Sequence, residues 1–283
     1  MSAVASHGLT ETPTPPALRI GLVLLAILAM LCIFGPWLAL ADPVKQDLLR
    51  TLAAPSLAHP FGTDHLGRDV LARVLHGAPR SLGIAVICVV IATSVGLLLG
   101  LIAAASGRLV DGLIMRLADL VLAFPGLLLA LLLALLLAGL MGGGIIPMMI
   151  GIKLTLWPQF ARMARATSRI TLQEAHVEAA RLAGLSRLHI LRHHLLPPVL
   201  RQTISLATLG VGAAILSISS LGFLGLGLQP PTPEWGAMIS ELLPYVAEAP
   251  AQMAAPCLMI VISVLAFTLV GERLTARLAG AET

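Results

Sequence analysis

Long apolar stretches without charged residues alternate with polar segments along this chain. Each of five stretches holds at least about 20 residues, which as a helix is enough to cross the roughly 30 Å hydrocarbon layer of a bilayer. The five stretches are residues 20–41, 81–107, 120–140, 203–228 and 249–271. We count residues 145–160 as a sixth span, although this stretch is shorter and contains Lys153, because the arginine-rich segment after it would otherwise face the wrong side of the membrane. The pattern predicts an all-α transmembrane bundle of about six spans.

The composition agrees with this prediction and excludes several protein classes. Hydrophobic residues form 58% of the 283 residues and charged residues only 11%, less than half of the roughly 25% in a typical soluble domain. An ordinary soluble enzyme, a disordered regulator and a secreted disulfide scaffold are therefore excluded. The three cysteines lie in different apolar stretches, so they fit neither a disulfide framework nor a metal site. The net charge of +4 is not gathered into a basic arm, which argues against nucleic acid as a partner.

The distribution of arginine and lysine predicts the orientation in the membrane. If the N-terminus is inside, twelve basic residues face the cytoplasm and five face outward, in agreement with the positive-inside rule. All five outward residues lie in the first outer loop, where four aspartates nearly balance them. Both termini are thus expected in the cytoplasm. The expected organisation is a tail at 1–17, a membrane anchor at 18–41, an outer loop at 42–80, a transmembrane core at 81–271 and a cytoplasmic tail at 272–283.

The first span has an alternative interpretation as a secretion signal that is removed. Ala39, Leu40 and Ala41 before Asp42 resemble a small-residue cleavage site. However, the apolar run is longer than the usual ~7–15 residues of a signal peptide, and only Arg19 precedes it. We therefore favour an anchor that is retained.

The segment between the fourth and fifth spans along the chain, residues 145–160 and 203–228, predicts two short helices on the cytoplasmic side. Thr171, with Glu174 three residues later, fits a capping box, and Gly184 stands where a helix would end. Ser186 fits the cap of a second helix, which Pro197 would stop. Two short helices joined at a glycine form a compact knob that another protein could contact. Amphipathic helices lying on anionic lipid are the alternative, and the residues by themselves favour neither interpretation.

Three motifs, at residues 61–73, 178–184 and 221–238, resemble one family of membrane proteins. Residues 178–184 read Glu-Ala-Ala-x-x-x-Gly and are similar to the cytoplasmic coupling loop of binding-protein-dependent ABC importer permeases. His194 departs from that pattern, because isoleucine is usual there. Residues 61–73 and 221–238 resemble the peptide and nickel subgroup of the family. The likeness extends over nearly the whole chain, from about residue 18 to residue 278.

The resemblance implies a type I ABC importer permease in a bacterial plasma membrane. In such a complex the chain would form half of a translocation pathway beside a second, similar permease. Two ATPase subunits would bind ATP and Mg²⁺, and an extracytoplasmic solute-binding protein would deliver the solute. The coupling loop would cover residues 164–202. The residues implied to receive the movement of the ATPases are Glu178, Ala179, Ala180, Arg181, Gly184 and Pro197.

The chain itself offers no motif that would drive transport. Neither lysine follows a glycine, as the phosphate-binding loop of ATPases requires, so no ATP site, no cofactor and no catalytic residue are expected. Small residues of the fifth span either line the pathway or only permit close helix packing, namely Ser217, Ser219, Ser220 and Gly222. Acidic residues of the last outer loop either dock the binding protein or form a solvated face, namely Glu234, Glu241 and Glu248.

The first outer loop ends in an expected amphipathic segment. Its charged residues are Asp64, Arg68, Asp69 and Arg73, and its apolar residues are Val70, Leu71, Val74 and Leu75. With the apolar side resting on the membrane or on the bundle, the segment would form a structural gating collar.

The sequence leaves the solute open between short peptides and nickel or a chelated metal. Eight histidines invite a nickel interpretation, but His59, His65 and His76 lie in the outer segment whereas His189, His193 and His194 lie in the knob, and no metal site is expected. An intramembrane enzyme would need an acid or histidine beside the serines of the fifth span, and none is predicted there. A non-ABC channel or secondary carrier is the alternative function, for which buried charge pairs or broken-helix repeats would be typical.

Overall fold

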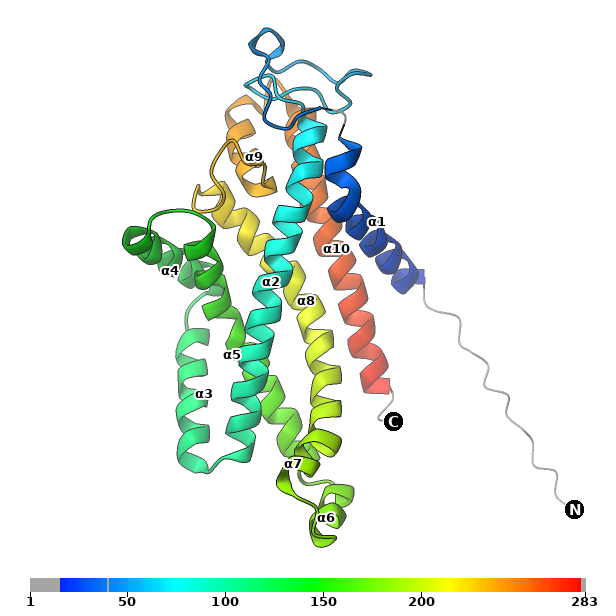
Figure 1. Cartoon of the computed structure of the whole chain (residues 1–283), viewed down its shortest axis with the longest axis vertical. Coiled ribbons are helices and arrows are strands. Elements are labelled where there is room, and N and C mark those ends of the chain that lie inside the picture. The colour runs from blue at the N-terminus through cyan, green and yellow to red at the C-terminus, as the bar shows by residue number, and fades with distance from the viewer. Residues whose placement is uncertain (1–15, 40, 281–283) are drawn as a thin grey trace, which may run out of the picture.

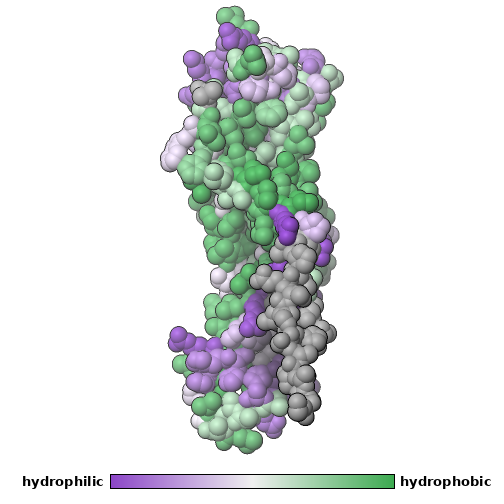
Figure 2. All heavy atoms as spheres, turned by 90° about the vertical axis from the view of Figure 1, so that its right-hand side faces the viewer, coloured by the Kyte–Doolittle hydropathy of each residue, from purple (hydrophilic) through white to green (hydrophobic). Residues whose placement is uncertain are grey.

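The computed structural model describes residues 16–39 and 41–280, with side chains up to residue 277. Within these residues the chain is helical, with no strand apart from one isolated bridge between Thr63 and Asp69. Figure 1 shows the long helices side by side, with α9 and the segment after α1 at one end and α6 at the other. Figure 2 shows an apolar band between two polar ends, as a bilayer requires. We call these ends the loop end and the knob end. The outermost parts of the predicted tails, residues 1–15 and 281–283, lie outside the described residues.

Four helices of the described chain are long and apolar enough to cross a membrane. They are α1 (Pro16–Leu38), α2 (Val70–Ala105), the continuous helix Arg187–Phe223 and α10 (Pro250–Gly280). The bent pair α3 (Arg108–Leu122) and α4 (Gly126–Met141) makes a fifth if it is counted as one span. The all-α membrane bundle is therefore confirmed, with four or five such helices where the sequence predicts about six.

The stretch at residues 120–140, predicted as one span, is broken into two helices. α3 ends at Leu122, α4 begins at Gly126, and the two helices are bent by 93°. Pro125 explains the break, because a proline disfavours the helical conformation of the residue before it and donates no backbone hydrogen bond. The sixth predicted stretch extends beyond residue 160 and becomes α5 (Ile145–Thr171), about 40 Å long at 1.5 Å per residue. Its polar residues, Lys153 among them, leave it less apolar than the other four.

The expected amphipathic segment is the buried beginning of α2. This helix begins at Val70, inside the predicted loop at 42–80, and the side chain of Asp69 caps it by accepting a hydrogen bond of 2.6 Å from the Ala72 backbone N–H. Val70 and Val74 are buried in the bundle core, so they do not rest on a membrane surface. The first outer loop therefore ends at about residue 69, after one short 3₁₀ turn at Leu48–Arg50.

Close packing between α2 and α5 forms the centre of the bundle. Gly96 and Gly100 on α2 face the backbone of α5, and a Cβ atom at Gly100 would lie 2.5 Å from the carbonyl oxygen of Ala161. Only a glycine permits this approach, which is typical of helix pairs in membranes. The aromatic ring of Phe160 is fully buried beside this contact. α5 is thus fixed along its length to the central helix of the molecule.

Candidate functional site

The predicted knob is present at the end of the molecule farthest from the outer loop. It consists of α6 (Ala175–Leu182), α7 (Arg187–Ile190) and a π turn at Leu191–Leu195, which leads into α8 (Leu196–Phe223). Figure 1 shows α6 projecting beyond the ends of the long helices. We use the term knob for residues 172–195. The loop predicted at 164–202 is therefore shorter, because residues 164–171 belong to α5 and residues 196–202 belong to α8.

The turn between the two knob helices is the one that the sequence predicts. Gly184 has a φ of +78°, a conformation that glycine adopts without steric cost. Its N–H donates to the Arg181 carbonyl at 3.0 Å, and the Leu185 N–H donates to the Ala180 carbonyl at 3.1 Å. This pair of bonds is a Schellman motif, which satisfies the free carbonyls at a helix end. Ser186 caps the second helix by accepting a hydrogen bond of 3.2 Å from the His189 N–H. Both cap predictions are confirmed.

Two other local predictions about the knob are wrong. Thr171 is the last residue of α5, and Glu174 caps α6 without a side-chain hydrogen bond, so these two residues form no capping box. Pro197 does not stop a helix, because it lies in the first turn of α8. A proline is tolerated at that position, where its missing N–H is not needed, and the π turn before it accommodates the change in hydrogen bonding.

The knob has a small hydrophobic core of its own. Val177, Ala180, Ile190 and Leu195 are buried together. Ala180, expected at a contact surface, therefore faces inward. The residues of the predicted coupling motif that remain exposed are Glu178, Ala179, Arg181 and Gly184. Leu182 is 84% exposed beside them and was not singled out from the sequence. Its position off the stripe formed by Val177 and Ala180 is the signal that could have identified it.

Hydrogen bonds and ion pairs join α5 to α8 and α3 close to the knob. α5 and α8 both end at the knob, and Thr167 on α5 donates a hydrogen bond of 2.6 Å to Gln202 on α8. Arg165 and Arg169 on α5 bind the carboxylate of Asp111 on α3, with N–O distances of 2.7 and 2.6 Å. α5 ends just before the knob and α8 begins just after it, so these two helices are the ones that the chain connects directly to the knob.

The small residues predicted to line a pathway on α8 point in different directions. Ser217 and Ser220 lie on a face that the described chain leaves at least partly accessible, and each donates to a carbonyl one turn earlier on α8. Ser219 is buried, and Gly222 packs directly under the carboxylate of Glu234. Gly222 and Ser219 thus serve the contact between α8 and α9, while Ser217 and Ser220 remain partly accessible.

Glu234 is a buried cap and not an exposed acidic residue. It begins α9 (Trp235–Leu242), where its carboxylate accepts hydrogen bonds of 2.9 Å from the backbone N–H groups of Gly236 and Ala237. Ser81 on α2 donates to the same carboxylate at 3.1 Å. Burial raises the pKa of Glu234, and the three hydrogen bonds only partly oppose this effect. Glu234 therefore holds α9 against α2 and is not available to dock another protein.

Glu241 is part of a buried ion-pair network that joins the outer loop to α9. Arg68 binds Asp64 and Glu241, each at 2.6 Å, and Arg73 binds Glu241 at 2.7 Å and also contacts Asp64. Arg68 and Arg73 are only 1% and 2% exposed. Burial by itself would raise the pKa of Asp64, but the two guanidinium groups and two backbone donors outweigh it and hold that pKa below its usual value. Of the three acids predicted to dock a binding protein, only Glu248 is exposed.

Ligand atoms of Asp64, His65 and Glu241 lie within 4.8 Å of one another, the only such group of three metal-ligating side chains in the described residues. The two carboxylates already bind Arg68 and Arg73, so a divalent cation would lie against two fixed positive charges. These residues are therefore a poor fit for a metal ion.

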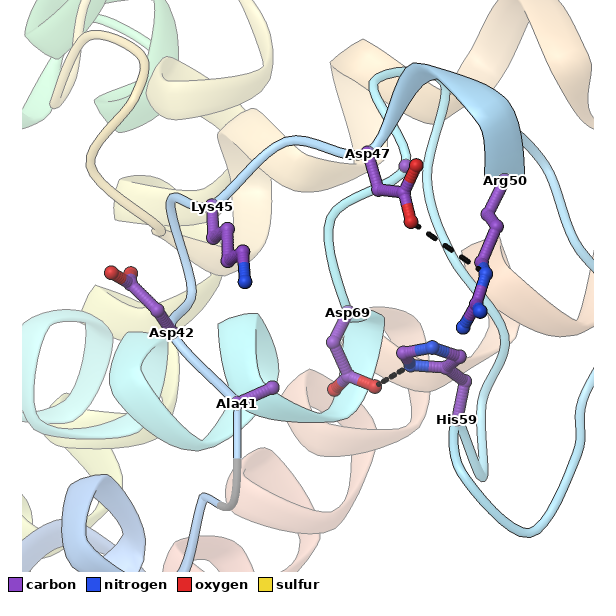
Figure 3. Close-up of a pocket in the computed structure, with 8 residues that line it drawn as sticks. Ala41, Asp42, Lys45, Asp47, Arg50, His59 and Asp69 are labelled. Atoms are coloured by element: carbon purple, nitrogen blue, oxygen red, sulfur yellow. Dashed lines mark hydrogen bonds and ion pairs between the residues drawn. The ribbon is translucent and has the colours of Figure 1, made fainter.

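A cavity of about 440 Å³, lined by several charged residues, opens beside the outer loop. Figure 3 shows Lys45 pointing toward the space between Asp42 and Asp69, with Arg50 on the opposite side. His59 binds Asp69 at 2.7 Å in its wall. The cavity presents both positive and negative side chains, which suits a polar partner of mixed charge. Its lining consists of Ala41, Asp42, Lys45, Asp47, Arg50, His59, Gly67 and Asp69.

Comparison with solved structures shows the fold. The permease structure of the MetNI methionine ABC transporter in an inward-facing conformation matches with a TM-score of 0.59, over 72% of this chain and 95% of that chain. The sequence identity is only 16%, so this likeness concerns the arrangement of the helices.

Comparison of sequences shows the family. The di/tripeptide transport system permease protein DppC of Pseudomonas aeruginosa is 41% identical over 90% of this chain and 84% of its own. The nickel transport system permease protein NikC of Escherichia coli is 36% identical over 91% of this chain and 92% of its own, and the glutathione transport system permease protein GsiD of Escherichia coli is 40% identical over 88% and 81%.

Two family descriptions match separate parts of the chain. Residues 16–55 match the N-terminal TM domain of oligopeptide transport permease C, and residues 96–280 match the binding-protein-dependent transport system inner membrane component. Members of this family are non-catalytic subunits, and the ATPase lies on separate subunits. The chain therefore belongs to the family of binding-protein-dependent transport system inner membrane components, as a multi-pass ABC importer permease of the peptide and nickel group.

Proposed function

We propose that this permease forms half of an import pathway for short peptides and receives the movement of its ATPases through the knob. Its partners are a second, similar permease, two ATPase subunits that bind ATP and Mg²⁺, and an extracytoplasmic solute-binding protein. The knob end faces the cytoplasm, as do both termini, and the loop end faces outward. The relatives named for di/tripeptide and glutathione transport support a peptide-like solute. Nickel or a metal chelate is the alternative that the experiment below distinguishes.

The observation that carries this proposal is the construction of the knob. It has its own hydrophobic core and a hydrogen-bonded Schellman turn at Gly184, so it holds its shape as a unit. Glu178, Arg181 and Leu182 are exposed on it, and charged groups around an apolar residue form a surface suited to a protein partner. In the chain, the knob follows directly after α5 and leads directly into α8. A protein that pulls the knob therefore moves two long helices of the bundle.

We assign the docking of the solute-binding protein to the loop end and the lining of the pathway to α8. Glu248 is exposed, and the cavity beside Lys45 and Arg50 offers charges of both signs. We assign the docking of the binding protein to this surface by charge complementarity. Ser217 and Ser220 are the remaining pathway-lining residues of α8.

The coupling role is tested by changing the exposed knob surface and its turn. Glu178→Arg combined with Gly184→Pro reverses a surface charge and removes the positive φ of the turn. We expect the variant to lose co-purification of the ATPase subunits and ATP-dependent transport. Glu272→Arg, the same charge change at an exposed position on α10, is the matched control and should retain both. Full ATPase association and transport in the double variant would refute the coupling role.

The solute is tested in vesicles that contain the complete transporter. The rate of ATP hydrolysis is compared after addition of binding protein loaded with dipeptide, with nickel or with a nickel chelate. We expect stimulation by the dipeptide form and transport of labelled dipeptide into the vesicles. Stimulation by nickel or its chelate without any response to dipeptide would overturn the peptide assignment while leaving the coupling role intact.

A further inference from the structure

Four of the eight histidines lie together on the knob. His176 comes from α6, and the other three come from α7 and the π turn, up to 18 residues further along the chain. The ring centroids of His189 and His193 are 4.2 Å apart, those of His176 and His194 are 5.2 Å apart, and those of His189 and His194 are 6.2 Å apart. We call His176, His189, His193 and His194 the histidine cluster. Neither the knob core nor the exposed coupling surface uses these rings.

The spacing of the rings is close to that of imidazoles bound to one metal ion. Metal–nitrogen bonds of about 2.0–2.1 Å place the ring centroids of two histidines on the same ion about 5 Å apart. The separation of 5.2 Å between His176 and His194 matches this spacing. The pairs at 4.2 and 6.2 Å lie on either side of it, and no three ligand atoms of the cluster lie within 4.8 Å of one another in the described structure, so binding of an ion requires the rings to rotate toward a common centre. His189 and His193 are four residues apart, a spacing at which a helix presents two ligands on one side.

The chemistry around the cluster also permits a cation. The carboxylate of Glu174 lies 3.1 Å from Nδ1 of His176 and adds a negative charge and a further oxygen ligand. Nδ1 of His193 contacts the His189 carbonyl at 3.2 Å, which leaves its Nε2 for a metal ion. Three arginines of the knob oppose a cation, but all three are exposed, so their long side chains can turn into solvent; they are Arg181, Arg187 and Arg192.

We propose that the histidine cluster binds one divalent transition-metal ion of the nickel, copper and zinc class. Imidazole is a preferred ligand of these ions, and magnesium and calcium, which prefer oxygen ligands, would not compete. The ion would connect α6 to the π turn before α8 and so fix the shape of the knob. This site is distinct from the Asp64–His65–Glu241 group, because two arginines neutralise that group and none is bound to the cluster in the described residues. The proposal does not depend on which solute is transported.

The test is a direct measurement of metal binding by the purified full-length chain. The protein is prepared in detergent or nanodiscs with a tag that contains no histidine, and Zn²⁺ or Ni²⁺ is titrated in competition with a chromophoric chelator above neutral pH, because the ligands must be deprotonated. We expect one site of micromolar or tighter affinity. His176→Asn combined with His194→Asn should weaken binding at least tenfold, whereas His76→Asn, a histidine of α2 far from the knob, should leave it unchanged.

Two further measurements keep the result independent of folding defects. His193→Asn changes an exposed ring, so the fold should be kept while metal affinity falls. X-ray absorption of the bound metal should count at least two imidazole ligands in the wild type. Absence of binding at about 100 μM metal, unchanged affinity in the double variant with wild-type elution, or loss of binding in His76→Asn would each overturn the proposal.

Discussion

The close glycine contact between α2 and α5 predicts how much stability a single added methyl group would cost. In Gly100→Ala the new Cβ would lie 2.5 Å from the Ala161 carbonyl oxygen, roughly 1 Å short of the ordinary van der Waals distance of about 3.4 Å. The obstacle is backbone, so it cannot rotate away, and such overpacking costs about 1–3 kcal/mol. Alanine regains up to about 1 kcal/mol of helix propensity. We therefore expect a net loss of about 1–2 kcal/mol.

Gly83 on the same helix is the matched control. A Cβ atom there would meet nothing within 4 Å, so Gly83→Ala keeps the propensity gain without the clash and should be neutral or stabilising. Thermal unfolding in detergent is followed by tryptophan fluorescence, because Trp157 is buried at this helix contact. At about 2–4 °C per kcal/mol, the Gly100→Ala midpoint should fall by several degrees below that of Gly83→Ala. Equal midpoints for the two variants would show that α2 and α5 are not packed backbone to backbone.

Three further predictions concern the outer ion pairs and the knob. Arg73→Met removes one partner from the buried carboxylate of Asp64 and from the partly buried carboxylate of Glu241. It should lower the free energy of unfolding by about 3–5 kcal/mol, measured by thermal unfolding against Glu248→Gln as an exposed control. Because the folded-state pKa of Asp64 is lowered, its ionised form stabilises the fold above the unfolded pKa of about 3.9, and this stabilisation is lost as the pH falls toward the lower folded pKa. Asp64→Asn should therefore be less stable than the wild type at about pH 7 and lose less stability on acidification. An identical dependence of stability on pH in both proteins would contradict this. Ser186→Ala removes a helix cap worth about 1 kcal/mol, so amide hydrogen exchange at residues 187–195 should accelerate about fivefold while α2 is unaffected.

Predictions from local pattern succeed where neighbouring residues decide the structure. The apolar stretches give the positions of α1, α2, α8 and α10 because a bilayer requires about 20 apolar residues. Gly184 and Ser186 are predicted correctly because a positive φ and a helix N-cap each depend on the type of a single residue. The single span predicted at residues 120–140 is wrong because counting apolar residues does not register Pro125, which breaks the helix.

Predictions fail where residues distant in the sequence meet. Glu241 is separated from Arg68 by 173 residues, and Ser81 from Glu234 by 153, so nothing near either acid in the sequence indicates that it is buried. The outer acids therefore resemble a solvated face, and the charged residues before α2 resemble one side of an amphipathic helix. His176 and His194 are similarly separated by a helix and a turn, which is why the histidine cluster is visible only in the structure.

The π turn at Leu191–Leu195 gives the knob a freedom that a regular helix would deny it. Each turn of this kind holds one residue more than an α-helical turn. Moving that surplus residue along the helix would change the direction in which nearby knob residues face, without breaking the helix. If the knob binds its partner as proposed, this junction would absorb small changes in the angle between the knob and α8, so that the knob stays in contact while the long helices tilt.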